Sequence, residues 1–411
     1  MSELPPGWAW TTLDELVFTR SGNSKLIKGK LPKSHRPGLF PAFSASGQDV
    51  WCPDAEYEGE GIVLSAVGAR CGKAFLATGA WTAIANTHVI LAASGIETRF
   101  LWYLLNDEAF WIRSGSAQSF VKVKASLETK LGLPPLHEQR RIVAAIEEQL
   151  SRLDAADASL AQGRARVDAL KRETVARALA GNWGVVTMSN VTESQAYGTS
   201  AKASSDASGV PVLRMGNING GRIDFTDLKY LAADHPDVAK LALRPGDLLF
   251  NRTNSPELVG KSAVFMGAEP MTFASYLIRV RFTERCDPQW AALVINSVIG
   301  RRYIATVRTQ QVGQANVNGT KLAAMPLPLP PLQEQQRIVS EVEERLSVID
   351  AMRASIERAE RRSAALRRSI LERAFRGELV PQDPSDEPAS VLVERIRAAR
   401  SSARPTHRSR V

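Results

Sequence analysis

A long segment of this chain occurs twice. The sequence LPPLHEQRRIV, which begins at Leu133, recurs as LPPLQEQQRIV from Leu329, at an offset of 196 residues. The match continues without a gap to Gly181 and Gly377, with 24 identical residues over 49 positions. A repeat of this length indicates a duplicated structural unit, and any fold of the chain has to accommodate both copies.

Each copy is predicted to form one long helix. Two prolines precede the helical part and favour an extended backbone before the first turn. Each copy ends at a glycine, Gly181 or Gly377, where we expect a left-handed helix cap. Between these ends, apolar residues recur every three or four positions, the period of a coiled-coil seam. The residues assigned to this interface are Leu136, Ile142, Ile146, Leu150, Leu153 and Leu160 in the first copy, and Leu332, Ile338, Val342, Leu346, Ile349 and Ile356 in the second.

Three seam positions in each copy are polar. They are Asp157, Arg164 and Lys171 in the first helix, and Arg353, Glu360 and Arg367 in the second. Polar seam residues cost stability but fix register, and the opposite charges favour antiparallel pairing of the two helices within one chain. The alternative is that the helix pair opens to water at these positions. Some 43 helical residues make a rod of roughly 65 Å, which is long enough to act as a spacer.

The two segments outside the helices share only a framework. Each opens with a tryptophan-led strand, from Trp8 or Trp183, and each contains a Gly-Lys pair, at Gly72 or Gly260, between apolar runs. A short amphipathic helix and a polar loop then lead to the LPPL sequence. The long stretches before the Gly-Lys pairs do not align. Two domains that recognise different targets are expected to differ in this way, although drift of exposed loops produces the same pattern.

The repeat and the shared framework together predict the fold class. We expect an α+β protein in which two mixed α/β domains are separated by two long helices that form an antiparallel coiled coil, with an internal pseudo-two-fold duplication. The predicted parts are a first domain (1–132), a first helical spacer (133–181), a second domain (182–328), a second helical spacer (329–377) and a tail with a short helix and a basic end (378–411).

Composition limits the partners and the compartment. The net charge is +9, but six arginines in residues 395–411 supply +6 of it, so the charge is weak evidence for nucleic-acid binding. No apolar run reaches the ~20 residues of a membrane-spanning helix, and the N-terminus does not resemble a secretory signal. The three cysteines are widely separated and suit a reducing compartment. We expect a cytoplasmic protein with no membrane partner.

Polar side chains in the loops suit a DNA groove. Arginine pairs with guanine and asparagine or glutamine pairs with adenine, each pair giving about 1–3 kcal/mol of discrimination, whereas lysine more often contacts phosphate. The candidates in the first domain are Arg20, Lys25, Lys28, Arg70, Lys73 and Lys122. The candidates in the second domain are Arg214, Asn217, Arg222, Asn251, Arg252, Asn254, Lys261, Gln311, Gln314 and Asn316. For each of them, the alternative is an ordinary solvated loop residue.

Motifs that carry enzymatic chemistry are missing. Gly260-Lys261-Ser262 ends like a phosphate-binding loop, but Ser255 stands where that loop needs its first glycine. No methyltransferase or dinucleotide-binding motif is present, and the five histidines have no metal-ligand spacing. We therefore expect no catalytic residue, no metal ligand and no cofactor in this chain.

Two LPPLxEQxRIV helices that alternate with two variable domains resemble the specificity (S) subunit of type I restriction–modification systems. The sequence RGELVPQDP from Arg376, the tryptophan-led domain starts and the paired Gly-Lys turns carry the same resemblance, which covers nearly the whole chain. The resemblance implies that each variable domain is a target-recognition domain reading one half of a split DNA site. It also implies that the paired helices set the gap between the half-sites.

The resemblance implies partners as well. They are double-stranded DNA, two modification subunits that carry S-adenosylmethionine and methylate adenine, and two restriction subunits that use ATP and magnesium to translocate and cleave DNA. The chain itself is then a non-catalytic DNA-binding component of host defence. One departure is the first domain's loop, which has Phe120 where the second has Asn316, and this weakens a base-contact role for that loop.

Two other classes of protein are alternatives to this interpretation. A fused modification or nuclease enzyme needs a catalytic domain, for which two repeats leave no room. A coiled-coil scaffold whose domains bind proteins predicts no salt-dependent affinity for duplex DNA, whereas phosphate contacts make affinity fall steeply with salt.

Overall fold

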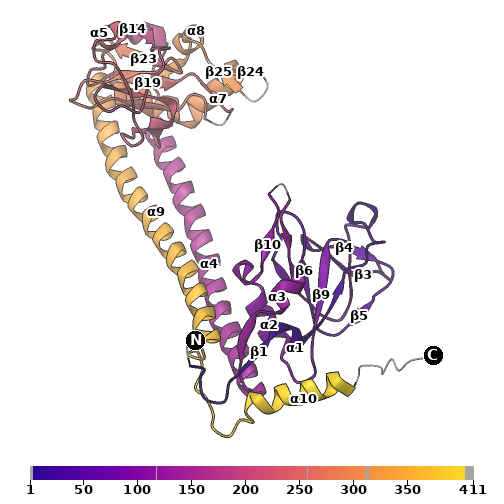
Figure 1. Ribbon diagram of the computed structural model, residues 1–411. Helices are drawn as coiled ribbons and strands as arrows, with labels where there is room; N and C mark the ends of the chain where they lie inside the picture. The colour runs from indigo at the N-terminus through magenta and orange to yellow at the C-terminus, as the bar shows by residue number, and fades with distance from the viewer. Residues whose placement is uncertain (1–2, 117, 257, 312–313, 403–411) are drawn as a thin grey trace. The chain divides into compact units, whose positions relative to one another are not determined.

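The structure is a computed structural model that describes residues 3–116, 118–256, 258–311 and 314–402 (Figure 1). The side chains of Asn254, Gln310, Gln311 and Gln314 are not among those described. The chain divides into two compact units, which comprise residues 1–159 with 359–411 (unit 1) and residues 160–358 (unit 2). Each unit contains one mixed α/β domain and the adjoining parts of both long helices.

Unit 1 contains a four-stranded antiparallel sheet in the order β2-β9-β6-β7. Its strands are β2 (Val17–Ser21), β6 (Gly61–Ser65), β7 (Ala74–Ala77) and β9 (Thr87–Ala92). A second sheet, in the order β4-β3-β8-β5, consists of β3 (Phe40–Ser44), β4 (Gly47–Cys52), β5 (Tyr57–Glu58) and β8 (Ala80–Ala83). Two short ladders pair β1 (Ala9–Thr12) with β12 (Lys130–Leu133), and β10 (Arg113–Ser114) with β11 (Phe120–Val121).

Unit 2 repeats the strand order of the four-stranded sheet, whereas its second sheet has three strands. Its four-stranded sheet has the order β14-β23-β19-β21 and consists of β14 (Thr192–Tyr197), β19 (Leu248–Asn251), β21 (Ser262–Val264) and β23 (Leu277–Phe282). A second sheet is formed by β15 (Val210–Leu213), β18 (Lys229–Leu231) and β22 (Thr272–Phe273), and β13 (Val185–Thr187) pairs with β26 (Pro326–Pro328). In both four-stranded sheets the last strand in sequence lies between the first and the second. The duplication therefore extends from the helices to the domains.

Short helices cover these sheets and complete the cores. Unit 1 contains α1 (Leu13–Leu16), α2 (Thr98–Leu105) and α3 (Val123–Leu127), and unit 2 contains α5 (Pro236–Lys240), α6 (Pro288–Asn296), α7 (Val298–Val307) and α8 (Gly319–Ala323). Helix α6 begins after Asp287, whose carboxylate accepts from the backbone N–H of Gln289 and Trp290. Such a cap satisfies backbone donors that the first helical turn leaves free.

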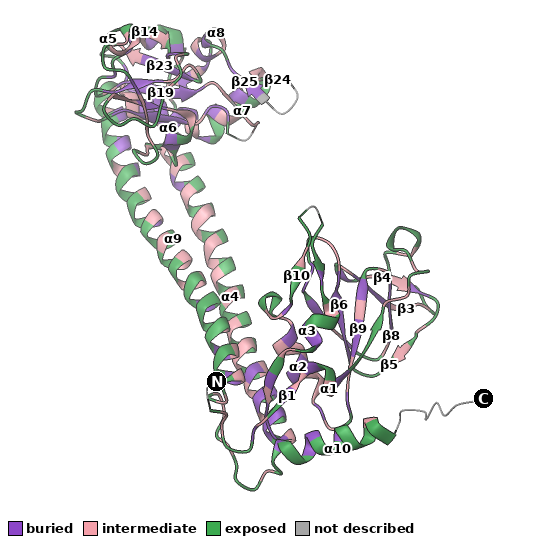
Figure 2. Ribbon diagram, viewed as in Figure 1, coloured by how far each residue is buried: buried purple, intermediate pink, exposed green. Residues whose placement is uncertain are grey.

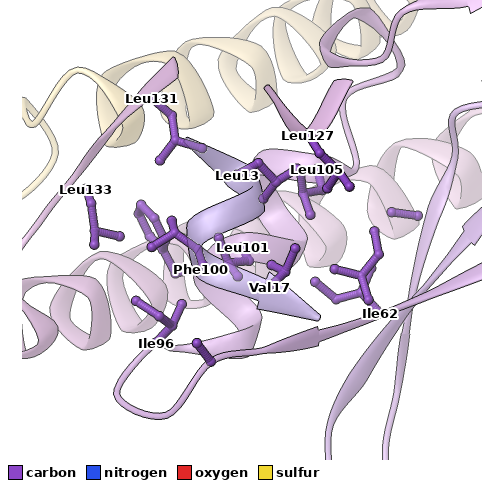
Figure 3. Close-up of a cluster of buried hydrophobic side chains, with 14 of the residues drawn as sticks. Leu13, Val17, Ile62, Ile96, Phe100, Leu101, Leu105, Leu127, Leu131 and Leu133 are labelled. Carbon is purple, nitrogen blue, oxygen red and sulfur yellow. The ribbon is translucent and has the colours of Figure 1, made fainter. Parts of the chain in front are cut away.

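The main core of unit 1 is built from α1, α2 and the facing side of the four-stranded sheet (Figure 3). Phe100, Leu101 and Leu105 lie on one face of α2 and are fully buried. They belong to one cluster with Leu13 of α1 and Ile62 of β6. Each side chain of this size contributes about 1.5–3 kcal/mol when it leaves water, so the cluster anchors α2 to the sheet.

The two long helices are α4 (Leu136–Ala178) and α9 (Leu332–Phe375). In unit 2, Lys171 of α4 forms an ion pair with Asp350 of α9 at 2.8 Å. In unit 1, Arg367 of α9 forms ion pairs with Asp157 at 2.8 Å and Asp154 at 2.6 Å. Residue numbers rise along α4 as those of their partners fall along α9, so the helices pair antiparallel within the chain, as expected (Figure 1). The fold class predicted from the sequence is confirmed.

The polar seam residues pair in a register that the sequence did not define. Asp157, Lys171 and Arg367 all contribute to ion pairs between the helices. Arg353 also forms one, but its partner across the helix pair is Asp168, at 3.3 Å. Exposed pairs of this kind contribute little stability, about 0–1 kcal/mol. Their value lies in fixing which residues of the two helices face each other.

The apolar seam merges with the domain cores at its two ends. Ile142 and Ile146 of α4 are fully buried in the core of unit 1, and Ile338 and Val342 of α9 are buried in that of unit 2. The partly buried seam residues Leu136, Leu150 and Leu153 pack against the first of these cores, and Leu346 packs against the second.

Towards the middle of the helices fewer residues of α4 and α9 are buried (Figure 2). Ile349 remains buried, whereas Leu160 and Ile356 are only half-buried. Leu332 is 37% exposed and therefore contributes little to the buried part of the seam. It is the first residue of α9 and precedes the turns that face the other helix.

The glutamine of the repeated motif joins each helix to its domain. Gln139 accepts a hydrogen bond from the backbone N–H of Glu97 at 2.9 Å and donates to the carbonyl of Pro134 at 2.9 Å. Gln335 accepts a hydrogen bond from the backbone N–H of Asp287 and donates to the carbonyl of Pro330, at 2.8 Å each. It also donates to the carbonyl of Arg285. Both side chains are fully buried. Because Glu97 and Asp287 cap α2 and α6, this glutamine connects the start of a long helix to the start of a domain helix.

The glycines at the ends of the repeat have different roles. Gly377 has a φ of +73°, and the backbone N–H of Glu378 donates to the carbonyl of Arg373 at 2.8 Å, which is the expected left-handed cap. Gly181 has no such conformation, and α4 ends three residues earlier, so the prediction of a left-handed cap there was wrong. A Cβ atom on Gly181 would lie 1.9 Å from the indole of Trp183. The indole of Trp183 therefore leaves no room for a side chain at position 181.

The tail forms helix α10 (Ala389–Ser402), which packs on the first domain. Leu392, Val393 and Ile396 are buried in the core of unit 1. Arg397 donates two hydrogen bonds to Glu15, at 2.8 and 2.9 Å, and lowers the pKa of that carboxyl to about 2. The helical part of the basic tail is therefore a structural element, and residues 403–411 lie outside the described part of the chain.

Within the described ranges, no helix is long and apolar enough to cross a membrane. No cluster of three or more His, Cys, Asp or Glu residues in these ranges is arranged to hold a metal ion. The cysteines are buried free thiols, and burial raises the pKa of Cys286 to about 12.

Candidate nucleic-acid interface

A small sheet in unit 2 collects several of the polar candidates. Its strands are β20 (Thr253–Asn254), β24 (Thr309–Gln311) and β25 (Gln314–Asn316), in the order β20-β25-β24 (Figure 1). The amide of Asn316 donates to the hydroxyl of Thr253 at 2.9 Å. Backbone hydrogen bonds join the carbonyl of Arg252 to Val317 N–H at 2.9 Å, and the carbonyl of Asn251 to Gly260 N–H at 2.7 Å. Hydrogen bonds thus join the described residues of the hairpin to those that follow β19.

Unit 1 contains the same arrangement. The carbonyl of Ala66 accepts from Val121 N–H at 2.9 Å, and the carbonyl of Ser65 accepts from Gly72 N–H at 2.9 Å. An isolated antiparallel bridge joins Val67 to Phe120, at the position where Thr253 pairs with Asn316 in unit 2. We call this shared arrangement the hairpin platform. Its described residues are 65–72, 113–116 and 118–121 in unit 1, and 251–256, 258–260, 309–311 and 314–317 in unit 2.

The two hairpin platforms carry different side chains on matching backbones. Ala66 in unit 1 corresponds to Arg252 in unit 2 by its hydrogen bond to the hairpin. Phe120, which is 42% exposed, corresponds to Asn316 by its place in the ladder. One surface is therefore apolar where the other offers hydrogen-bonding groups. Surfaces that differ in this way on a common scaffold suit recognition of two different targets.

Arg252 is the best-positioned cation of the unit 2 platform. Its guanidinium lies 4.9 Å from the centre of the Tyr197 ring, and its Nη1 donates to the carbonyl of Ser275 at 3.5 Å. The hydroxyl of Tyr197 accepts from Gly319 N–H at 2.8 Å. The aromatic ring and the carbonyl hold the half-buried arginine in place, which lowers the entropy cost of a contact with a ligand. Tyr197 is not among the residues predicted from the sequence, because it lies in a stretch that does not align between the two domains.

Two arginines bind backbone carbonyls between β20 and β21. Arg301 donates to the carbonyl of Val259 at 2.8 Å, and Arg308 donates to that of Pro256 at 2.8 Å. Burial lowers the pKa of Arg301, although the group remains charged at neutral pH. These hydrogen bonds hold the carbonyls of Pro256 and Val259, between β20 and β21.

Several predicted contacts are structural instead. Asn217 is buried, and its side chain accepts from Arg214 N–H and donates to the carbonyls of Asp224 and Thr226, all at 2.9 Å. Asn251 is fully buried at the end of β19. In this structure neither amide is exposed to a base edge. Arg214 is half-buried and pairs with Asp227 at 3.0 Å.

In unit 1 the structure brings together two of the predicted basic residues. Lys28 donates to the hydroxyl of Ser46 at 3.1 Å and pairs with Asp49. Arg70 donates to the carbonyl of the same serine at 3.0 Å. Lysine and arginine thus lie on either side of Ser46, at the edge of the hairpin platform. Since Lys28 is already paired, Arg70 is the more available of the two for a phosphate.

The remaining candidates are distributed more widely. Arg20, Lys25, Lys73, Lys122 and Arg222 are exposed, and Lys261 is half-buried. Arg20 lies on the edge strand β2 and Arg222 on β17 (Arg222–Ile223), neither of which is a strand of a hairpin platform. The side chains of Asn254, Gln311 and Gln314 lie outside the described part of the structure, although their backbones belong to the unit 2 platform.

The chain matches the family model for the type I restriction modification DNA specificity domain at residues 43–162 and again at 181–361. The two matches cover most of the chain, and it therefore belongs to this family. One curated relative is the specificity subunit of the type I restriction enzyme EcoKI from Escherichia coli K12, which is 26% identical over 296 residues. That match covers 66% of this chain and 64% of the relative, so the chain spans less than two thirds of the EcoKI subunit.

Solved structures show the same fold. A chain from a type I R-M system, determined to explain its complex assembly and conformational transition, has a TM-score of 0.70 and 19% identity, with coverage of 92% of this chain and 100% of that chain. The HsdS subunit from Thermoanaerobacter tengcongensis has a TM-score of 0.51 and 20% identity, with coverage of 92% and 98%. The resemblance to specificity subunits that the sequence carries is confirmed at the level of family and fold.

Proposed function

We propose that this chain is the DNA-recognition subunit of a type I restriction–modification complex and reads a bipartite target. Each hairpin platform, with its surrounding loops, contacts one half-site, and the paired helices set the gap between them. The chain carries no catalytic residue. The observation that carries the proposal is the double family match on two domains whose four-stranded sheets share one strand order and whose platforms present different side chains.

The remaining chemistry belongs to partner subunits in this proposal. Two modification subunits supply S-adenosylmethionine and methylate adenine, and two restriction subunits supply ATP-driven, magnesium-dependent translocation and cleavage, in the cytoplasm. Exposed apolar residues on the long helices support protein docking there. Val348 and Met352 stand one turn apart on α9 and are 54% and 47% exposed, and Leu170 of α4 is 43% exposed.

Sequencing of adenine methylation in cells with and without the gene tests this function. We expect methylation at one split target that is lost when the gene is deleted. Replacement of residues 1–132 by the first domain of another family member should change one half-site and leave the other intact. Methyl transfer by the purified chain alone would contradict the proposal, as would the absence of salt-dependent affinity for duplex DNA.

Arg252→Ala is expected to weaken specific DNA binding by about tenfold or more, because one guanidinium contact to a base is worth about 1–3 kcal/mol. The change should affect one half-site only, which a competition assay with targets mutated in either half will show. Arg358→Ala, at an exposed position of α9, removes the same charge and serves as the control. Equal loss in both variants would mean that Arg252 acts only through the general positive field.

A further inference from the structure

Trp8 in unit 1 and Trp183 in unit 2 open equivalent domains beside equivalent helix starts. In unit 1 the indole N–H of Trp8 donates to Glu138 at 3.0 Å, and Glu138 is 1% exposed. In unit 2 the corresponding acid is Glu334, but the indole N–H of Trp183 is buried and finds no hydrogen-bond partner in the described structure. An unmade hydrogen bond of a buried donor costs about 1–3 kcal/mol. The tryptophan at the start of each domain therefore has a hydrogen-bond acceptor in unit 1 but none in the described part of unit 2.

The two helix starts differ in the segment that covers the motif glutamate, which is Glu138 in unit 1 and Glu334 in unit 2. In unit 1 the tail after α9 folds back over Glu138. Gln382 of the tail donates to the carbonyl of Gly377 at 2.6 Å and to Glu138 at 3.4 Å. Asp386 forms a two-pronged ion pair with Arg141, with distances of 2.7 and 3.4 Å, and its side chain is only 7% exposed. The segment from 378 to 388 thus occupies this position.

In unit 2 the same position is open. A cavity of about 370 Å³ is lined by Gly181, Trp183, Glu334 and Arg337, together with neighbouring residues of α4 and α9. Gly181, Glu334 and Arg337 are the repeat equivalents of the residues that the tail covers in unit 1. With no tail carboxylate to bind, Arg337 pairs with Glu334 at 2.7 Å and Glu341 at 3.1 Å, and its side chain is 61% exposed.

Chain connectivity explains why unit 2 lacks a cover. After α9 the chain is free to continue as a tail, because the first domain starts separately at the N-terminus. After α4 the chain must enter β13 within a few residues of Gly181. Among the described residues, the few that join α4 to β13 do not cover the second motif as residues 378–388 cover the first. We therefore look for the segment that fills this cavity in another molecule.

We propose that the cavity of unit 2 binds an extended acidic segment of a partner protein that resembles residues 378–388. One of its carboxylates pairs with Arg337, as Asp386 pairs with Arg141. Glu334 is then released from Arg337 and accepts the indole N–H of Trp183, as Glu138 accepts that of Trp8. That the partner is another subunit of the complex rests on the proposed function, whereas the cavity and its ligand chemistry do not.

A fluorescent peptide of residues 378–388 serves as the probe, titrated against the full chain by anisotropy. We expect one saturable site. Arg337→Glu should weaken binding at least tenfold, and a peptide carrying Asp386→Lys should recover affinity for this variant by charge reversal. Arg358→Glu makes the same change of charge outside the cavity and should leave binding unchanged. In the amide spectrum of the full chain, the indole N–H signal of Trp183, assigned with Trp183→Phe, should shift on binding.

Three outcomes would overturn the proposal. The first is no binding up to about 1 mM peptide, which corresponds to only about 4 kcal/mol of affinity. The second is binding that Arg337→Glu leaves unchanged. The third is dimerisation of the full chain that Arg337→Glu abolishes, because the occupant would then be the tail of a second copy. None of these assays contains DNA, so the proposal and the recognition function can fail separately.

Discussion

Replacement of Gln335 by leucine is expected to lower the free energy of unfolding by about 3 kcal/mol, since a buried group that loses its partner costs about 1–3 kcal/mol. Leucine has a similar volume but no hydrogen-bonding group. It would leave Asp287 N–H without an acceptor, and the carbonyls of Pro330 and Arg285 without a donor. Denaturant unfolding followed by circular dichroism measures the change.

The neighbouring residue offers a matched control. Gln336 is exposed on the same turn of α9, so Gln336→Leu should change stability by no more than about 0.5 kcal/mol. Gln139→Leu should repeat the large loss in unit 1, because Gln139 makes the equivalent bonds. Equal stability of the Gln335 and Gln336 variants would show that the repeated glutamine does not join the helix to the domain.

Insertion of seven residues into both long helices is expected to lengthen the gap in the DNA target by up to about 3 base pairs, since seven helical residues add about 10.5 Å. The insertions belong after Gly163 in α4 and before Ile356 in α9, because these residues face each other, with 3.5 Å between the ideal Cβ position of the glycine and the isoleucine Cδ1. A heptad preserves the seam. The two half-site sequences should stay the same, and methylation sequencing will show both properties.

An insertion in one helix alone is the control for this experiment. It moves Lys171 away from Asp350 and Asp168 away from Arg353 on one side of the insertion, so the single variants should be less stable than the paired one. Half-site sequences that change in the paired variant would contradict the spacer role. An unchanged gap would contradict it as well.

The sequence by itself predicted the parts of this protein that depend on local periodicity. The repeat from Leu133 and Leu329, the apolar spacing and the charged seam positions predicted two long helices that pair antiparallel, and the structure and the comparisons confirm that fold class. Such patterns are readable because helix geometry relates residues three and four positions apart, whatever the rest of the chain does. The resemblance carried by the same motif predicted the family.

The roles of the polar residues were decided only by the tertiary structure. Asn217 and Arg252 both stand in short clusters of asparagine and arginine in the sequence of the second domain. In the structure Asn217 is buried and bonds to its own turn, whereas Arg252 lies at the hairpin platform beside Tyr197. The basic tail, which the sequence left without a role, packs on the first domain through Arg397 and Glu15, 382 residues apart. The physical reason is common to all of these residues. Burial and pairing depend on contacts between segments far apart in the chain, and no local spacing encodes them.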